Sequence, residues 1–138
     1  MPLITAALTC LALNIYHEAK DQKPEGQMAI ALVVHNRVHD EQKTVCGVVF
    51  AKRQFSWTNG NASLNKYGNV KLNKDYMPEK NDKEWLMAKR IAKLSYKVAD
   101  FTHGATYFHS KKVHPYWSKD FKRTLVLGDH VFYRKVNT

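Results

Sequence analysis

Apolar residues recur at helical spacing over residues 3–19, a stretch that ends in a short polar cluster. The recurring positions are Ile4, Leu8, Leu11 and Ile15. Glu18 follows Leu11 by seven residues, almost two helical turns, so both side chains lie on one helix face. The pattern predicts a helix from about Leu3 to Ala19 with Glu18 on its buried stripe. Burial there would raise the pKa of the carboxyl group.

Three further helices are predicted. The second runs from about Glu25 to Val38 and is apolar nearly all round over residues 28–34, so it should be central. A short third helix covers about 45–51. The fourth begins near Asn81 or Asp82 and runs to about Ala99. Its predicted buried stripe comprises Trp85, Ala88, Ile91, Ala92, Ser95, Val98 and Ala99.

Residues 58–81 have weak periodicity, and we expect a long surface excursion with turns that contacts substrate. Beyond the fourth helix, residues 105–109 are typical of a strand. Residues 124–127 and 130–133 predict a hairpin around Gly128-Asp129. Helices followed by a small antiparallel sheet indicate the α+β class, with a single domain over residues 1–138.

The charge balance is strongly basic, with 22 Lys and Arg against 12 Asp and Glu, a formal net charge of +10. Such a surface attracts nucleic acid, anionic lipid or the acidic polymers of a bacterial envelope, and charge does not choose between them. The spacing of a nucleic-acid-binding module is absent, so we expect no nucleic-acid partner.

The two cysteines, Cys10 and Cys46, each lie in an apolar stretch and are predicted to be small buried residues. Two cysteines cannot form a disulfide framework, but a single disulfide remains open. No basic segment precedes the first apolar run and no small-residue cleavage site follows it. We therefore expect a core helix there and no signal peptide.

Four polar or aromatic clusters stand apart from the core pattern. They are Tyr16-His17-Glu18, Gln54-Phe55-Ser56-Trp57, Thr106-Tyr107-Phe108-His109 and Pro115-Tyr116-Trp117. An aromatic-lined groove with a few hydrogen-bonding groups suits sugars, and a buried Glu suits general acid catalysis near neutral pH. The alternative is that the aromatic residues are mostly core.

Several ordered motifs resemble the SleB-type cell wall hydrolases, which comprise spore-cortex lytic enzymes and related phage and bacterial peptidoglycan hydrolases. The motifs are residues 15–19, 26–31, 33–38, 44–49, 54–57, Asp100, 104–109, 115–117 and 128–133. The match covers nearly the whole chain, apart from the excursion at 58–81.

The resemblance implies a fold related to lysozyme and lytic transglycosylases, with a helical part and a small β part around a glycan groove. It implies that Glu18 is the catalytic acid and that the bond between N-acetylmuramic acid and N-acetylglucosamine is cleaved. The family commonly carries a second Glu shortly after the catalytic one. Gln22 stands at that position and supplies only hydrogen bonds.

A single Glu favours a lytic transglycosylase, in which Glu18 protonates the glycosidic oxygen and then acts as base while the muramic acid 6-OH closes on C1. We expect Tyr107 and His109 to stabilise the transition state or hold the N-acetyl group. We expect sugar contacts from Gln54, Ser56, Trp57 and Trp117.

Three alternatives stay open. The first is a muramidase with Asp21 or Glu25 as second carboxylate, since hydrolytic glycosidases use two. The second is a zinc amidase that uses the histidines, among them His103 and His109 with Asp100, although HExxH is absent. The third is a basic wall-binding module without catalysis.

We expect no metal or other cofactor, and peptidoglycan glycan strands as the substrate. The small basic build suggests a monomeric phage endolysin made in the host cytoplasm without a signal peptide. It would reach the periplasmic cell wall through a partner such as a holin.

Overall fold

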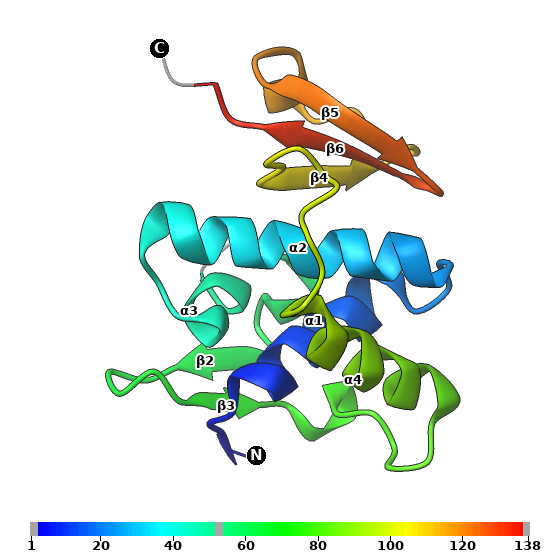
Figure 1. The fold of residues 1–138 in the computed structure, drawn as a ribbon. Helices are drawn as coiled ribbons and strands as arrows, with labels where there is room; N and C mark the ends of the chain where they lie inside the picture. Colours follow the sequence, from blue (N-terminus) through cyan, green and yellow to red (C-terminus); the bar gives the residue numbers. More distant parts are fainter. Residues whose placement is uncertain (1–2, 52–53, 137–138) are drawn as a thin grey trace.

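The computed structural model describes residues 3–51 and 54–136, and helix α2 lies at its centre. Three helices lie on one side of α2 and a three-stranded sheet on the other (Figure 1). The helices are α1 (Ala7–Ala19), α2 (Pro24–Glu41), α3 (Val45–Val49) and α4 (Lys83–Ser95). The sheet has the order β4-β6-β5, from β4 (Tyr107–Ser110), β5 (Lys122–Leu127) and β6 (His130–Arg134), all antiparallel.

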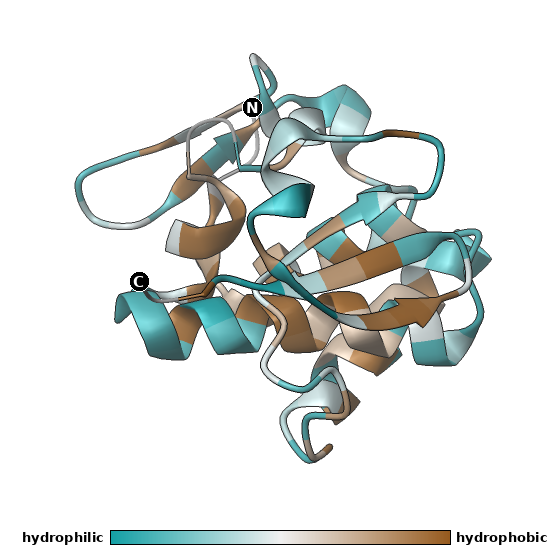
Figure 2. Ribbon diagram, turned by 90° about the horizontal axis from the view of Figure 1, so that it is seen from above, coloured by the Kyte–Doolittle hydropathy of each residue, from teal (hydrophilic) through white to brown (hydrophobic). Residues whose placement is uncertain are grey.

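Helix α2 is buried on both faces, as its all-round apolar pattern predicts. Every residue from Gly26 to Val34 is buried. Ala29, Ile30 and Val33 pack against Phe132 of β6, while other α2 residues join the larger core formed with α1, α3 and α4. Seen from above in Figure 2, apolar colour lies both on the strands of the sheet and on the central turns of the helix beneath them. In the described ranges, no helix has both the length and the apolar content that crossing a membrane requires.

The first helix begins at Ala7, so the predicted start at Leu3 is wrong. Leu3–Ile4 instead form strand β1, which pairs with the strand at residues 70–72. Leu8, expected on the buried stripe, is 43% exposed, whereas Leu11 and Ile15 are fully buried. Because residues 3–4 form a strand, the helix begins later than predicted, and its buried stripe starts at Cys10.

The excursion at 58–81 contributes two strands to a second sheet, which its weak periodicity does not predict. Strands β2 (Ala62–Leu64) and β3 (Val70–Leu72) pair with β1 in the order β1-β3-β2. Short 3-10 helices flank the hairpin at Ser56–Thr58 and Lys74–Tyr76. Val70 and Leu72 are fully buried and Lys71 is exposed, the alternation of a half-buried strand. Three residues are too few for that alternation to stand out in a sequence.

The fourth helix confirms the predicted start, because the Asp82 side chain accepts hydrogen bonds from the backbone N–H groups of Glu84 and Trp85. It ends at Ser95, so the predicted end near Ala99 is wrong and Val98 is exposed.

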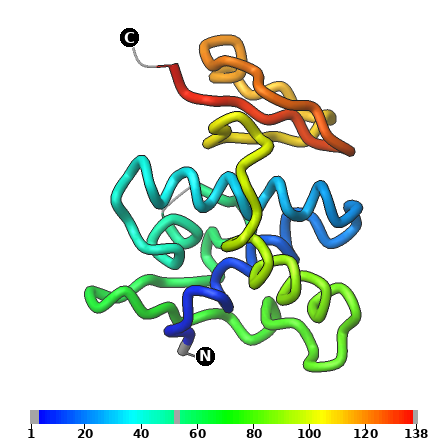
Figure 3. The backbone as a smooth tube through the Cα atoms, in the orientation of Figure 1, coloured from blue at the N-terminus to red at the C-terminus, as the bar shows by residue number. Residues whose placement is uncertain are grey.

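The C-terminal hairpin is confirmed, with Leu127 opposite His130 across the Gly128-Asp129 turn. A third 3-10 helix, Tyr116–Lys119, precedes it. The connection from α4 crosses α2 to reach β4 (Figure 3). Asn36 of α2 anchors this connection, since its amide donates to the Asp100 carboxylate at 3.1 Å and to the Ala105 carbonyl at 2.9 Å. The anchor fixes where the sheet begins over α2.

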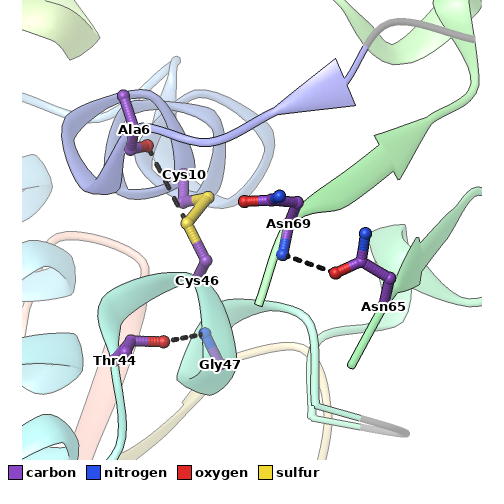
Figure 4. Close-up of a disulfide and its surroundings, with 7 residues drawn as sticks. All are labelled: Ala6, Cys10, Thr44, Cys46, Gly47, Asn65 and Asn69. Carbon is purple, nitrogen blue, oxygen red and sulfur yellow. Dashed lines mark hydrogen bonds between the residues drawn. A yellow bond between two sulfur atoms is a disulfide. The ribbon is translucent and has the colours of Figure 1, made fainter. Parts of the chain in front are cut away.

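Cys10 and Cys46 are buried, as expected, and they form a disulfide, the option that the sequence left open (Figure 4). Their Cα atoms are 5.3 Å apart. The bond joins α1 to α3 and closes a long loop that includes α2. It therefore constrains the helix that carries Glu18 in its last turn.

Replacing both cysteines by serine should lower the free energy of unfolding by about 3 kcal/mol, because the crosslink restricts the unfolded chain. Thermal unfolding with and without a reductant measures this. The reductant should lower the Tm of the wild type by about 10 °C and leave the double variant unchanged. An unchanged wild-type Tm in reductant would contradict a stabilising disulfide.

Candidate active site

A cavity of about 640 Å³ opens between α2, strand β4 and the segment that follows α3. The end of α1 contributes Glu18 and the middle of α2 contributes Val33. The segment after α3 contributes Phe55, and β4 contributes Phe108. Phe55 and Phe108 face each other with ring centroids 6.0 Å apart. The cavity thus lies between the helical part and the sheet, as the sequence predicts for a glycan groove.

Glu18 lies in the last turn of α1, above the fully buried Leu11 and Ile15. Among the described residues, none forms a hydrogen bond or ion pair with its carboxylate. Burial is the cause that raises its pKa to about 7, because little water remains to solvate the charge. A carboxylic acid with this pKa is substantially protonated at neutral pH. It can donate a proton to a leaving oxygen and then accept one back.

The two residues before Glu18 fix the end of α1. The Tyr16 hydroxyl donates to the Asp82 carboxylate at 2.7 Å, and this bond raises the pKa of Tyr16 to about 12. A nitrogen of the His17 ring lies 2.8 Å from the Tyr76 carbonyl oxygen. Burial lowers the pKa of His17, so the neutral ring donates this bond. The position of Glu18 is thus tied to α4 and to the excursion.

Trp57 supports this helix end and does not line the cavity. Its ring stacks on His17 with centroids 4.2 Å apart, and its Nε1–H donates to Asn14 Oδ1 at 3.0 Å. One face of the half-buried Trp57 ring and its indole N–H are engaged by other residues of the chain. Its contact with sugar stays a prediction.

The other predicted substrate-binding residues line the cavity. They are Gln54, Ser56 and Trp117, predicted for sugar contact, and Tyr107 and His109, predicted for the transition state or the N-acetyl group. Of the excursion at 58–81, Asn59 is the described residue that lines it, so most of that segment lies elsewhere.

The aromatic wall is organised around His109. Its Nδ1 lies 2.7 Å from the Ser110 carbonyl, so Nδ1 carries the proton. Its Nε2 then accepts from the Tyr133 hydroxyl at 2.9 Å. The Trp117 ring packs edge-on against the Tyr133 ring. The centroids of the Tyr107 and Trp117 rings are 5.5 Å apart. These contacts hold aromatic faces at the cavity wall, where an apolar sugar face can stack.

Gln22 forms two hydrogen bonds with the hairpin turn at one end of the cavity. Its amide donates to the Asp129 carboxylate at 2.9 Å, and its Oε1 accepts from the Asp129 N–H at 3.1 Å. Gly128 has a φ of +55°, and a Cβ there would lie 2.5 Å from Gln22 Oε1, so the close approach needs glycine. The residue that departs from the family pattern therefore joins the helical part to the sheet.

Four charged or titratable cavity residues were missed as site residues: Arg37, Lys112, Asp129 and His130. Arg37, Asp129 and His130 lie in motifs that carry the family resemblance, which was the available signal, whereas Lys112 lies outside them. Asp21 also lines the cavity, while Glu25 is exposed and is not part of its lining. In residues 3–51 and 54–136, no group of three or more His, Cys, Asp or Glu side chains could hold a metal ion. Asp100 caps the loop before β4 by accepting from the backbone of Thr102 and Gly104.

Comparison with known proteins gives the family. The model of the cell wall hydrolase family matches residues 21–133 of this chain. The chain therefore belongs to the cell wall hydrolase family, as the sequence motifs predict. It is an enzyme that acts on peptidoglycan. No curated protein matches the chain.

Two solved structures share the fold. The catalytic domain of the germination-specific lytic transglycosylase SleB from Bacillus anthracis is 23% identical, with a TM-score of 0.70 over 93% of each chain. The catalytic domain of the Bacillus cereus SleB protein is 22% identical, with a TM-score of 0.69 over 95% of this chain and 92% of that one. These likenesses confirm the α+β, lytic-transglycosylase-like fold.

Replacing Glu18 by Gln should stabilise the protein at high pH and not at low pH. The folded-state pKa of Glu18 lies above the ordinary value of 4.5, so the folded protein binds more protons and loses stability as the pH rises from about 4.5 to 7. At pH 8 the variant should be more stable by about 2–3 kcal/mol, and at pH 4 the two should be equal.

Chemical unfolding at both pH values measures this difference, with Glu25→Gln as the control because Glu25 is exposed. Equal effects of the two substitutions at pH 8 would show that Glu18 is not desolvated.

Proposed function

We propose that this enzyme cleaves the bond between N-acetylmuramic acid and N-acetylglucosamine as a lytic transglycosylase, with Glu18 as its one catalytic carboxyl group. The observation that carries the proposal is the half-buried Glu18 in the cavity wall, with its pKa raised by desolvation to about 7 and no partner among the described residues. The similarity in fold to a lytic transglycosylase supports it.

In the first step the protonated Glu18 donates its proton to the glycosidic oxygen as the C1–O bond breaks. Positive charge develops at C1 and the ring oxygen, and the carboxylate that forms on Glu18 stabilises it. In the second step Glu18 takes the proton from the muramic acid 6-OH as that oxygen bonds to C1. The proton returns to Glu18, and the product is a 1,6-anhydro end.

The cavity also favours a second candidate, a hydrolytic muramidase. Asp21 and Asp129 line the same cavity as Glu18, and a carboxylate can activate a water for attack on C1. Gln22 holds one oxygen of Asp129, which orients that carboxylate. The candidates for the second carboxylate are therefore Asp21 and Asp129. Glu25, the other candidate from the sequence, is exposed and does not line the cavity.

We further propose that the enzyme works as a phage endolysin, a monomer that reaches the periplasmic wall with the help of a holin. The disulfide supports action outside the reducing cytoplasm. The net charge of +10 supports retention on anionic wall polymers. Expression with and without a holin, followed by the turbidity of the culture, tests this role; lysis that is equally fast without the holin would contradict it.

Glu18→Gln should reduce the rate of peptidoglycan cleavage by about a hundredfold to ten-thousandfold, because Gln cannot donate a proton to the leaving oxygen. Release of soluble fragments from purified sacculi measures the rate, and thermal unfolding shows that the variant is folded. A folded variant with full activity would exclude Glu18 as the acid.

Mass spectrometry of the wild-type fragments separates the two candidates. A transglycosylase gives muramic acid ends that are one water lighter than the hydrolysed ends of a muramidase. If hydrolysed ends dominate, Asp21→Asn and Asp129→Asn identify the second carboxylate.

The kcat/KM of the wild type should fall about tenfold per pH unit above about pH 7, because only protonated Glu18 can act as the acid. Initial rates on sacculi between pH 5 and 9 give the profile, and binding to sacculi at the same pH values serves as the control. A rate that stays level to pH 9 while binding is unchanged would contradict the proposed role.

A further inference from the structure

The cavity lining carries charges of both signs, with Glu18, Asp21 and Asp129 as its acidic residues and Arg37 and Lys112 as its basic residues. Strand β4 runs along the cavity, with Tyr107 beside Arg37 at one end and Ser110 paired with His130 at the other. At that second end Gln22 holds Asp129. Along α2, Pro24 and Arg37 are separated by about 20 Å at the rise of an α-helix. Acidic groups therefore lie at the start of α2, and a buried guanidinium lies some three to four turns further on.

Arg37 is only 7% exposed, and its charge is only partly compensated. Its Nε–H donates to a carboxylate oxygen of Glu41 at 2.7 Å. The other oxygen of that carboxylate lies 3.3 Å from Lys43 Nζ. Two cations thus share one carboxylate, which leaves a net positive charge beside the cavity. One anionic group of a ligand would balance it.

The Arg37 guanidinium has one face covered by an aromatic ring and one nitrogen without an acceptor among the described residues, and the residue lines the cavity. The guanidinium carbon lies 4.9 Å from the centre of the Tyr107 ring, so the aromatic ring covers one face. Nη1 is buried, and no acceptor among the described residues reaches it. A buried charged donor without an acceptor is costly, and a ligand oxygen that pairs with it gains a charge-assisted hydrogen bond.

We propose that Arg37 binds a carboxylate of peptidoglycan and thereby positions the glycan strand relative to Glu18. The proposal rests on the proposed function, because it assumes that the cavity holds a glycan strand. The carboxylate belongs either to the peptide stem or to the lactyl group of a muramic acid that has lost its stem. A guanidinium recognises a carboxylate better than a sugar hydroxyl, because its N–H groups match two oxygens at once.

The test measures binding of catalytically impaired protein to sacculi, so that cleavage does not alter the substrate. Arg37→Met and Arg37→Lys are each combined with Glu18→Gln. Arg90→Met in the same background is the matched control, because Arg90 is exposed on α4 and its loss changes the net charge equally. The probes are native sacculi and sacculi whose carboxylates have been converted to methylamides with a carbodiimide.

On native sacculi, Arg37→Met should weaken binding tenfold to a hundredfold, the range for loss of a charge-assisted hydrogen bond. Arg37→Lys should weaken binding less, because lysine keeps the positive charge and loses only the paired N–H donors of the guanidinium. Arg90→Met should change it less than twofold. On methylamidated sacculi, Arg37→Met should bind as well as the protein that retains Arg37.

An equal loss on both kinds of sacculi, or no loss on either, would overturn the proposal. An equal loss on both would show that Arg37 contacts a neutral oxygen or stabilises the fold. No loss on either would show that its Nη1 does not bind the glycan strand. Arg37→Lys keeps the test decisive if Arg37→Met fails to fold. Full lytic activity of Glu18→Gln would overturn the proposed mechanism, whereas an equal loss on both kinds of sacculi in an inactive Glu18→Gln background would overturn only the role of Arg37. Absence of binding to native sacculi would overturn both.

A third probe separates the two sources of the carboxylate. Treatment with an amidase removes the stem and leaves a lactyl carboxylate on each muramic acid. If the effect of Arg37→Met persists on these stripped strands, the lactyl group is the ligand. If it disappears, the peptide stem is the ligand.

Discussion

Desolvation of the Glu18 carboxyl group is the constraint on which the site depends. A charged carboxylate in this position is partly desolvated and, in the described ranges, has no protein partner, so the fold must hold it there against its preference for solvent. The anchors of Tyr16 on Asp82 and of His17 on the Tyr76 carbonyl do this for the end of α1. The stability given up at Glu18 is the condition for a proton donor that works near neutral pH.

The second requirement is a second wall of the cavity that holds Glu18. The sheet forms this wall, and α2 supports it. The helix packs against α1 with one face and against the sheet with the other, so both walls of the cavity share one rigid element. Asn36 fixes the chain that leads into β4, and Gln22 clasps the turn between β5 and β6. A family position that usually carries a Glu thus serves here to join the two parts of the molecule.

The sequence was most informative where the pattern extends over many residues. The buried α2, a helix cap at Asn81 or Asp82 and the Gly128-Asp129 hairpin were all predicted, because each follows from local periodicity or turn chemistry. The β1-β3-β2 sheet was missed because its strands are two or three residues long and pair across distant parts of the chain. The disulfide was left open for the same reason, since only the packing of α1 on α3 brings Cys10 and Cys46 together.

The site shows the same division. Glu18 follows from its spacing to Leu11, and most predicted sugar contacts lie in the cavity. Trp57 does not, because no local pattern tells whether an aromatic ring faces a groove or covers a helix end. Arg37 was not predicted as a site residue, because in the sequence it lies in the polar end of an apolar helix. Only the three-dimensional arrangement shows that Tyr107 and Glu41 cover its guanidinium beside the cavity.

The account is tested most directly by the titration of Glu18 itself. The side-chain carboxyl carbon, followed by NMR between pH 3 and 9 and assigned by its absence in Glu18→Gln, reports the pKa in the folded protein. We predict a midpoint near 7, well above the ordinary value of 4.5. A midpoint near 4.5 would show a solvated carboxylate and would contradict the proposal that burial makes Glu18 the catalytic acid.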